Sequence, residues 1–422
     1  MRYLYSFFLY LLAPFLWLRL KWKGKRLPAY RRRIKERFAL YLVPVEPVDL
    51  WIHAVSLGEV IAAAPLIETL LRRSMKVLVT TMTPTGSNEL QRRFGSRVKH
   101  QYAPYDIPWV VKRFYQKYQP KKVVILETEL WPNWIYYAGK QNIPCFLANA
   151  RLSQKSYQQY RKLRFFFKGL LNTFTGILSQ HEEDAARYRS LGAEAAKVEV
   201  LGNLKFDLQL YTVNNHQEIF LNVAQPLQQQ WGANRPVVIV ASTHEPEEEL
   251  ILAEVKKLEN AIRNVIVLIA PRHPERFQTV YRLCQRLSFN VGLRSEPETI
   301  NGHNEIVVLD AIGELLAFYQ LSDYVFVGGS LVPVGGHNVL EPISMKVPVF
   351  CGPYFFNFKS ICKELMEMGA LEVIQDGGEF TKKIVALHNN LPRKQYMVET
   401  AMQMLDNNKG AVARYVDRII GE

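Results

Sequence analysis

The sequence lacks the short motifs that mark the commonest nucleotide and metal sites. It contains no GxxxxGK[ST] and no GxGxxG, which excludes a P-loop and a dinucleotide fingerprint. It has no Asp-x-Asp pair to hold a divalent cation against a diphosphate, and no His or Cys cluster at zinc spacing. We therefore expect no metal and no cofactor.

Cysteine is scarce, with four residues in 422. The four lie apart in apolar stretches, which favours reduced core residues in a cytosolic chain.

Basic residues are not scarce, but they are unevenly distributed along the chain. Eleven Lys and Arg against three Asp and Glu place +8 of the formal +14 in the first fifty residues. A DNA-binding domain would spread its charge over a folded face, so we expect no nucleic acid partner.

An uncharged run of sixteen residues, Tyr3 to Leu18, begins near the N-terminus, and basic residues follow it. It is shorter than the roughly 20 apolar residues of a spanning helix. It could span with its flanking arginines snorkelling, or lie in the interface, and a cleaved signal peptide is disfavoured. We expect residues 1–26 to anchor the chain to the cytoplasmic leaflet of a membrane. Deleting them should then leave the fold intact.

From Asp49 onward, short apolar strands alternate with amphipathic helices in two successive series. Strands separated by helices of ten or more residues indicate βαβ units and parallel sheets. The sequence therefore predicts an α/β protein with two Rossmann-like, doubly wound domains that face a cleft. We expect the anchor over 1–26, a first domain over 27–205, a linker over 206–234, a second domain over 235–399 and a C-terminal helix over 400–422.

A glycine-rich stretch, Gly328 to Pro342, follows the apolar run Tyr324 to Val327. Glycines let the main chain approach a ligand, and a helix start behind them offers N–H groups to an anion. The alternative is a glycine turn with a capping box, in which Asn338 is the N-cap and Glu341 the third helical residue. The sequence leaves both interpretations open.

Three carboxylates follow strands of the first series. Glu59 opens a helix after Ser56-Leu57-Gly58, where it could complement the helix dipole or act as a general base. Glu127 and Glu129 follow a very apolar strand, and side chains two apart on a strand share a face. A carboxylate left there needs a partner or a raised pKa.

Polar side chains follow strands of the second series too. Ser242, Thr243 and His244 come directly after a strand, and a well-capped helix accounts for the acids behind them but not for the hydroxyls. Arg272 and His273 follow the next strand. Arginine there suits a phosphate or a carboxylate, which it can bind with two hydrogen bonds.

Taken together, these stretches resemble the Kdo transferases (3-deoxy-D-manno-octulosonic acid transferases), GT-B glycosyltransferases of lipopolysaccharide assembly. The resemblance covers nearly the whole chain and is carried by seven motifs in order. The motifs are His53 to Glu59, Glu127 to Asn133, Asn149 to Ser153, Gly202 to Asp207, Ser242 to Glu245, Ala270 to Arg276 and Gly335 to Pro342.

The resemblance implies metal-independent, inverting transfer of Kdo from CMP-Kdo to the tetra-acylated lipid A precursor. It makes Glu59 the general base and Glu127 a second essential acid, with Glu129 and Lys205 as further candidates. The first domain would bind the acceptor and the second the donor. A glycolipid acceptor would explain an anchor in inner-membrane lipid. The implied donor ligands are Ser242, Arg272, His273, Gly335, Gly336, Asn338 and Glu341.

Two alternatives remain. One is a GT-B enzyme that uses a nucleoside-diphosphate sugar on another lipid acceptor. The other is a membrane-tethered scaffolding protein with an inactive GT-B fold, which the intact Glu59 and donor motifs disfavour.

Overall fold

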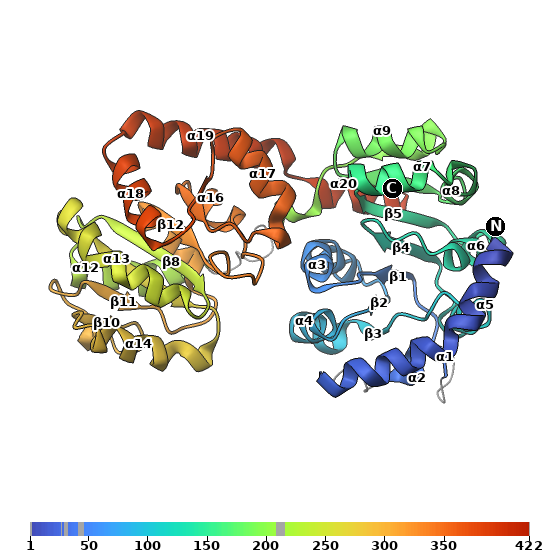
Figure 1. Ribbon diagram of the computed structural model, residues 1–422, viewed down its shortest axis with the longest axis horizontal. Coiled ribbons are helices and arrows are strands. Elements are labelled where there is room, and N and C mark those ends of the chain that lie inside the picture. Colours follow the sequence, from blue (N-terminus) through green and yellow to red (C-terminus); the bar gives the residue numbers. More distant parts are fainter. Residues whose placement is uncertain (1, 27, 29–32, 41–45, 208–215, 422) are drawn as a thin grey trace. The chain divides into compact units, whose positions relative to one another are not determined.

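The computed structural model describes residues 2–26, 28, 33–40, 46–207 and 216–421. The chain forms two compact units, residues 1–210 together with 408–422, and residues 211–407. Each unit is built on a seven-stranded sheet with helices packed around it (Figure 1). Every described strand pairing in both sheets is parallel, as the alternation of strands and helices predicts.

The first sheet has the strand order β3-β2-β1-β4-β5-β6-β7. Strand β1 pairs with β2 on one side and with β4, the central strand, on the other, so the loops after β1 and β4 leave from the same edge. That edge carries Glu59 and Glu127. The strands are β1 Leu50–His53, β2 Val77–Thr81, β3 Lys99–Tyr102, β4 Lys122–Leu126, β5 Cys145–Ala150, β6 Gly176–Ser179 and β7 Val198–Val200.

The helices of the first unit bury apolar side chains against this sheet. Trp51 of β1 lies at the centre, with ring centroids 4.4 Å from Phe114 and 4.8 Å from Trp134. The described helices are α1 Arg2–Arg26, α2 Ile34–Arg37, α3 Leu57–Arg72, α4 Pro84–Phe94, α5 Pro108–Tyr118, α6 Pro132–Lys140, α7 Gln154–Arg161, α8 Arg164–Leu171, α9 Glu182–Ser190 and α20 Ala411–Ile420, with short η2 Gly95–Arg97, η3 Ala195–Lys197 and η4 Leu204–Asp207.

The second sheet has the order β10-β11-β9-β8-β12-β13-β14, with β8 and β12 as neighbours. Its strands are β8 Val237–Thr243, β9 Ile266–Pro271, β10 Val291–Leu293, β11 Ile306–Val308, β12 Tyr324–Val327, β13 Val349–Cys351 and β14 Glu372–Val373. The helices are α11 His216–Ile219, η5 Phe220–Ala224, α12 Gln225–Trp231, α13 Glu247–Ala261, η6 Pro274–Arg276, α14 Phe277–Arg286, η7 Pro297–Thr299, α15 Leu315–Tyr319, α16 Leu340–Ser344, η8 Phe356–Phe358, α17 Lys359–Glu367, α18 Gly377–His388 and α19 Leu391–Asn408.

Helix α1 packs along the first unit near α5 and α6 (Figure 1). Leu9 and Ala13 join a small core with Ile107 and Val110. The opposite side of α1 is apolar and exposed, so the helix has a docked face and an unpartnered face. We name the second the outer face. Its residues are Tyr3, Leu4, Phe7, Phe8, Tyr10, Leu11, Leu12, Phe15, Trp17, Leu18 and Trp22.

The C-terminal region differs from the single helix expected over 400–422. Helix α19 ends at Asn408 and α20 begins at Ala411, with Gly410 between them in a left-handed conformation, φ 79°. Tyr415 of α20 donates to the carbonyls of Leu178 and Gly202, which ties the chain's end to the first unit. Of the expected linker over 206–234, residues 208–215 lie outside the described residues, and 216–231 are helical.

Candidate active site

Glu59 lies in the first turn of α3, directly after β1. Its Oε2 accepts a hydrogen bond of 2.7 Å from the Val55 N–H, and its Oε1 accepts one of 3.2 Å from the Ser56 hydroxyl. The residue is 8% exposed. Reaching back to the chain before the helix is what a capping carboxylate does, so part of its role is structural.

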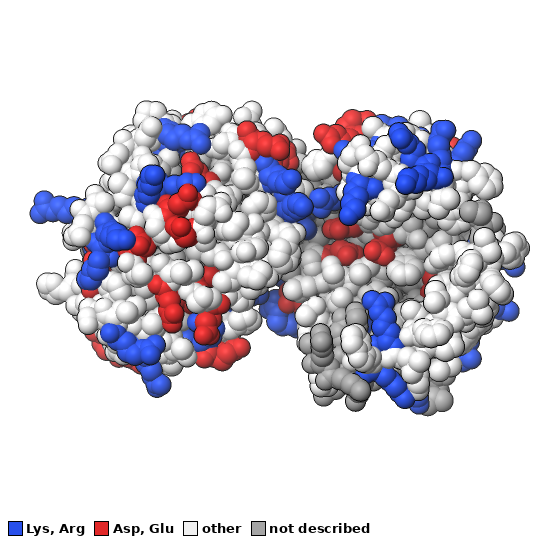
Figure 2. Space-filling view, viewed as in Figure 1, with Lys and Arg blue, Asp and Glu red and all other residues white. Residues whose placement is uncertain are grey.

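The pKa of Glu59 is raised further than a helix-capping role would require. Burial, and then the negative charge of Glu127, raise its pKa to about 8, against hydrogen bonds that lower it. Glu129 adds to the rise, and its own pKa is raised by burial. A carboxylate whose pKa lies near the operating pH is suited to proton transfer, which is what a general base performs. Figure 2 shows acidic side chains gathered on the first unit, over α3 and β4.

Glu127 is the residue after β4, and its backbone is left-handed, with φ 58°. A non-glycine residue adopts this conformation at a cost, so the surrounding structure must hold it. The Glu127 N–H donates to the Ala148 carbonyl of β5, and the Thr128 hydroxyl donates to the Arg151 carbonyl. Strain held in place at the carboxyl end of a strand is typical of a functional site.

Lys205 lies in η4, which packs against α3, the helix of Glu59. The Lys205 N–H donates to the Asn203 side chain, and the N–H of the preceding residue, Leu204, donates to the Asn149 side chain. The motif that begins at Asn149 and the motif that ends at Asp207 therefore contact each other here. The motif's last residue, Asp207, caps α20 by accepting from Gly410 and Val412.

In the second unit, Ser242 stands near the end of β8 with φ 55°, and a register shift toward β9 accompanies it. Behind it, Glu247 is fully buried. Its carboxylate accepts four backbone N–H groups, from His244, Gly329, Ser330 and Leu331, at 2.6 to 2.9 Å. Burial raises the pKa of Glu247, and these N–H groups act against that rise.

This carboxylate corrects the interpretation of the glycine-rich stretch as an open anion-binding loop. The Gly329 N–H is bonded to Glu247, and the N–H groups of Gly335 and Gly336 both donate to the Gly329 carbonyl. The Gly328 N–H donates to Ala241. All four glycine N–H groups are used within the unit, so the glycines here shape a turn.

The glycines are needed for space and conformation. A Cβ on Gly335 would lie 2.4 Å from the Phe356 ring, and Gly335 and Gly336 both have positive φ. The helix behind them, α16, has five residues and begins at Leu340. Asn338 accepts a hydrogen bond from the Leu340 N–H and donates one to Glu341, at 3.1 Å each. The two residues expected in the capping box therefore do interact, but the helix begins one residue later than expected.

Arg272 follows β9 and is exposed. Among the described residues, no carboxylate lies within ion-pair distance of its guanidinium, whereas Arg276 binds Glu245 and Glu248. His273 is also exposed, with its ring edge-on to His244 at a centroid distance of 5.1 Å. Arg272 is thus a cation available to an anionic ligand.

Sequence reasoning assigned no role to a histidine pair in this corner of the second unit. The Nε2 atoms of His244 and His337 lie 2.9 Å apart, and the two ring planes differ by 4°. Burial, and nearby cationic groups, lower the pKa of His244 to about 4 and that of His337 to about 3. Both histidines lie in recognised motifs, on the loops after the neighbouring strands β8 and β12.

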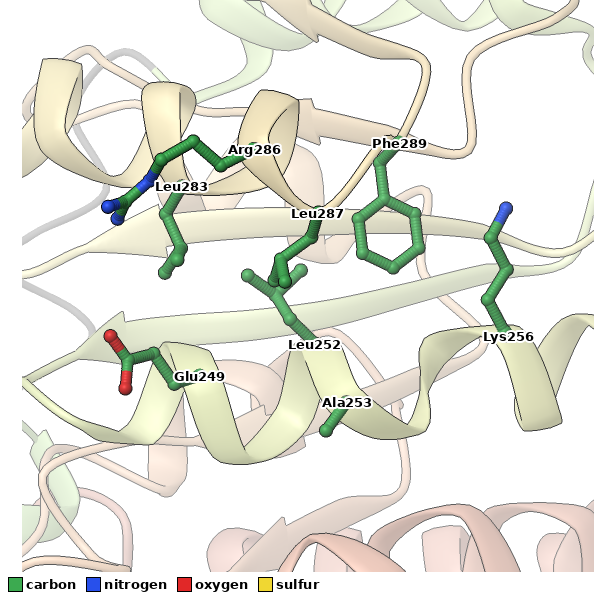
Figure 3. Close-up of a pocket in the computed structure, with 8 residues that line it drawn as sticks. All are labelled: Glu249, Leu252, Ala253, Lys256, Leu283, Arg286, Leu287 and Phe289. Carbon is green, nitrogen blue, oxygen red and sulfur yellow. The ribbon is translucent and has the colours of Figure 1, made fainter.

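A separate pocket of about 580 Å³ lies between α13 and α14 (Figure 3). None of the predicted site residues lines it. Its walls are apolar side chains with a charged rim. The lining residues are Glu249, Leu252, Ala253, Lys256, Leu283, Arg286, Leu287 and Phe289.

Comparison with known proteins identifies the family. A family model described as 3-deoxy-D-manno-octulosonic-acid transferase (kdotransferase) matches residues 32–208. The 3-deoxy-D-manno-octulosonic acid transferase of Haemophilus influenzae is 36% identical over 421 residues, 99% of this chain and 97% of that protein. The chain belongs to the Kdo transferase family. The Bordetella pertussis Kdo transferase is 32% identical over 381 residues, 88% of this chain and 86% of that protein.

The fold class is confirmed as well. MurG of Acinetobacter baumannii superimposes with a TM-score of 0.54 at 12% identity, over 88% of this chain and 99% of MurG. Two parallel-sheet Rossmann-like units in such a chain are the GT-B architecture. The protein is a glycosyltransferase of lipopolysaccharide biosynthesis.

Proposed function

We propose that this Kdo transferase moves Kdo from CMP-Kdo to the tetra-acylated lipid A precursor, with inversion and without a metal, at the cytoplasmic face of the inner membrane. The observation that carries the proposal is the buried Glu59 carboxylate in the first turn of α3, after β1, at the sheet edge where the neighbouring strand β4 ends in Glu127. It supplies a base in a chain whose relatives are Kdo transferases.

The proposed step balances with one base. An acceptor hydroxyl attacks the anomeric carbon of Kdo while Glu59 takes its proton, and the bond from that carbon to the phosphate oxygen of CMP breaks. CMP leaves with the electron pair. A single displacement of this kind inverts the configuration. Glu127 then has the supporting role of raising the basicity of Glu59 by its charge.

The donor is proposed to bind the second unit through Arg272, Ser242 and His273, with Asn338 and Glu341 beside the nucleoside. Arg272 has no carboxylate partner within ion-pair distance among the described residues, which leaves it for the donor phosphate. A carboxylate such as Glu341 accepts from ribose hydroxyls. Gly335 and Gly336 contribute by their missing side chains, which let a ligand approach the turn.

Metal independence is proposed from the ligand chemistry. CMP-Kdo carries one phosphate, whose charge an arginine can neutralise, and the sequence has no Asp-x-Asp pair. In the part of the chain that the structure describes, no three His, Cys, Asp or Glu side chains are grouped so as to hold a metal.

Membrane attachment is proposed from the outer face of α1. Residues 2–22 are long and apolar enough to cross a bilayer. The docked face of α1 is engaged with the protein, which favours a position in the interface with the outer face toward lipid. Basic side chains also gather over α7 to α9 (Figure 2), and Phe165 of α8 is 83% exposed, so 157–167 is a second candidate contact.

Mass spectrometry of the lipid product tests the proposal. The enzyme is incubated with CMP-Kdo and the tetra-acyl precursor, with and without excess EDTA, and a UDP-sugar replaces CMP-Kdo as the control donor. We expect one or more Kdo residues on the lipid from CMP-Kdo alone, at an unchanged rate in EDTA. Product from the UDP-sugar only would favour the nucleoside-diphosphate alternative, and loss of turnover that magnesium restores would reject metal independence.

A further inference from the structure

Asn133 is the last residue of the motif Glu127 to Asn133, and it lies fully buried in the first turn of α6. The first turn of a helix leaves N–H groups without partners inside the helix. Here the carboxylate of Asp106, in the loop before α5, accepts from the N–H groups of Asn133 and Trp134 at 3.0 and 2.9 Å. The Asn133 side-chain N–H donates to the Asp106 carbonyl at 2.7 Å. The start of α6 is therefore held by a residue of another loop.

Helix α1 supplies further partners to Asn133, and its N-terminal end lies beside α6 (Figure 1). The Asn133 Oδ1 accepts from Arg2 Nη1 at 3.2 Å and from the Ser6 hydroxyl at 3.1 Å. Four positions apart on a helix, the two donors lie on the same side of α1. The Arg2 guanidinium also lies 3.5 Å from the centre of the Tyr136 ring of α6. The first two turns of α1 thus bind the start of α6 through polar side chains.

These polar contacts are more than an anchor requires. Leu9 and Ala13 already dock α1 on the first unit through apolar contacts. Buried hydrogen bonds select one geometry, because a buried group left without its partner costs the desolvation of that group. Ser6 is 6% exposed and Asn133 is fully buried, so a shift of α1 would leave the Asn133 oxygen without these donors. The polar contacts therefore fix where α1 lies relative to α6.

The loop between β4 and α6, residues 127–131, is held at both of its ends. At its start, the Glu127 N–H donates to the Ala148 carbonyl while Glu127 keeps its left-handed conformation. At its end, Trp131 stacks on Trp134, the residue after Asn133, with ring centroids 5.3 Å apart. A residue stays in such a conformation only while the surrounding structure holds it. Movement of the start of α6 would therefore reach the loop and allow Glu127 to relax.

Trp134 extends this contact to the motif that contains Glu59. Its ring packs edge-on against the ring of His53, the last residue of β1, at a centroid distance of 4.7 Å. The motif that begins at His53 ends at Glu59. The start of α6 thus contacts the segments that carry both carboxylates, Glu59 and Glu127.

We propose that Arg2 and Ser6 are positioning residues of this enzyme, and that they act through Asn133. Their contacts hold the 127–131 loop, and with it the position of Glu127 relative to Glu59. Membrane attachment and turnover are then coupled, because the helix whose outer face is proposed to meet lipid also fixes this loop through its docked face. The inference rests on the proposed function in taking Glu59 as the base and α1 as the membrane contact.

The paired variant Arg2→Met/Ser6→Ala tests the positioning. It removes both α1 donors to Asn133, and methionine keeps an unbranched side chain in place of arginine. Turnover with CMP-Kdo and the tetra-acyl precursor is measured in detergent, so that membrane attachment does not limit it. We expect turnover to fall about ten- to a hundredfold, as small misplacements of an active site do. CMP affinity, measured by calorimetry, should stay at the wild-type value, because the donor is proposed to bind the second unit.

The pH dependence of kcat/KM shows whether the loop has moved. A general base acts in its deprotonated form, so kcat/KM falls as pH drops through the pKa of Glu59 in the free enzyme. The charges that raise this pKa are those of Glu127 and Glu129, and both lie on the 127–131 loop. If the loop moves away, the pKa of Glu59 decreases and the fall of kcat/KM shifts to lower pH. A variant that is only less stable loses turnover without this shift.

Thr381→Val is the matched control, because it also removes a hydroxyl that donates a hydrogen bond. That bond runs from the Thr381 side chain to the Glu254 carbonyl at 3.3 Å, within the second unit. Thr381→Val should match wild type in turnover per folded enzyme and in the pH at which kcat/KM falls. A shift of this pH in the control as large as in the paired variant would overturn the inference.

The remaining outcomes separate the inference from the proposed function. Wild-type turnover in the paired variant, or lower turnover at an unshifted pH, would show that α1 does not position the loop. If the paired variant does not fold, Ser6→Ala alone decides, with a smaller shift in the same direction supporting the inference and an unshifted pH overturning it. A wild-type profile without a fall near pH 8 would instead reject Glu59 as the base, and the inference with it.

Discussion

The negative charge of Glu127, at the end of β4, raises the pKa of Glu59, which follows the neighbouring strand β1. The relationship predicts what Glu127→Gln does. With that charge removed, the pKa of Glu59 should fall from about 8 toward its usual 4.5, without reaching it because burial remains the larger cause. NMR titration of labelled glutamate carboxyl carbons measures the shift. Glu298→Gln, at an exposed site in the second unit, should leave the pKa of Glu59 unchanged.

The same pKa predicts how stability depends on pH. A folded-state pKa of about 8 lies above the usual 4.5, so the folded protein holds the Glu59 proton more tightly than the unfolded chain. The contribution of Glu59 to the free energy of unfolding is therefore fully present below pH 4.5 and is lost as pH rises toward 8. Denaturant unfolding at several pH values should show this decline in wild type and a flatter profile in Glu59→Gln. Equal slopes in the two proteins would mean that Glu59 titrates normally.

Arg272→Ala should weaken CMP binding by about 1.5–3 kcal/mol, the usual contribution of a hydrogen bond to a charged group. The matched control is Arg286→Ala, at the rim of the pocket between α13 and α14 (Figure 3). Calorimetry should find CMP affinity close to wild type in the control. Wild-type affinity in Arg272→Ala would remove Arg272 from the donor site.

The two faces of α1 should separate membrane binding from stability. Serine at Phe8, Leu11 and Phe15 of the outer face, each more than half exposed, should reduce binding to anionic vesicles and leave the free energy of unfolding nearly unchanged. Ser6→Ala removes one of the two hydrogen bonds that the fully buried Asn133 side-chain oxygen accepts from α1, so it should cost about 0.5–1.5 kcal/mol of stability and keep vesicle binding. Cosedimentation and denaturant unfolding measure the two effects.

The docked face also changes the expectation for truncation. Besides Ser6, Arg2 donates to Asn133, and Tyr5 lies against Asp106, whose pKa burial raises to about 7. Removing residues 1–26 would leave these buried polar groups without α1. We now expect the truncated protein to be less stable than wild type, in contrast to the intact fold expected from sequence. A truncated protein with unchanged unfolding free energy would show that α1 is only a tether.

The placement of Glu59, Glu127 and Arg272 after strands could be predicted from sequence because parallel strands read as short apolar runs. The hydrogen bonding of the glycine-rich stretch could not be predicted from sequence. Its N–H groups are taken by Glu247, more than eighty positions away, and no local pattern reports such a contact. The His244–His337 pair depends likewise on β8 and β12 being neighbours. Strands β10 and β14, with three and two residues, were too short to show as periodic patterns.

The central claim is that Glu59 is the catalytic base. Glu59→Gln keeps the shape of the side chain and its hydrogen bond from Val55, and it removes the basicity. A positioned base contributes on the order of 10²–10⁴-fold, whereas a capping acid contributes only about 0.3–1 kcal/mol of stability.

The decisive measurement is the turnover of Glu59→Gln with CMP-Kdo and the tetra-acyl precursor, next to its CMP affinity and unfolding free energy. We predict a folded protein with wild-type CMP affinity and at least about a hundredfold lower turnover. A folded variant that keeps most of its turnover would contradict the account and make Glu127 or Glu129 the better candidate for the base.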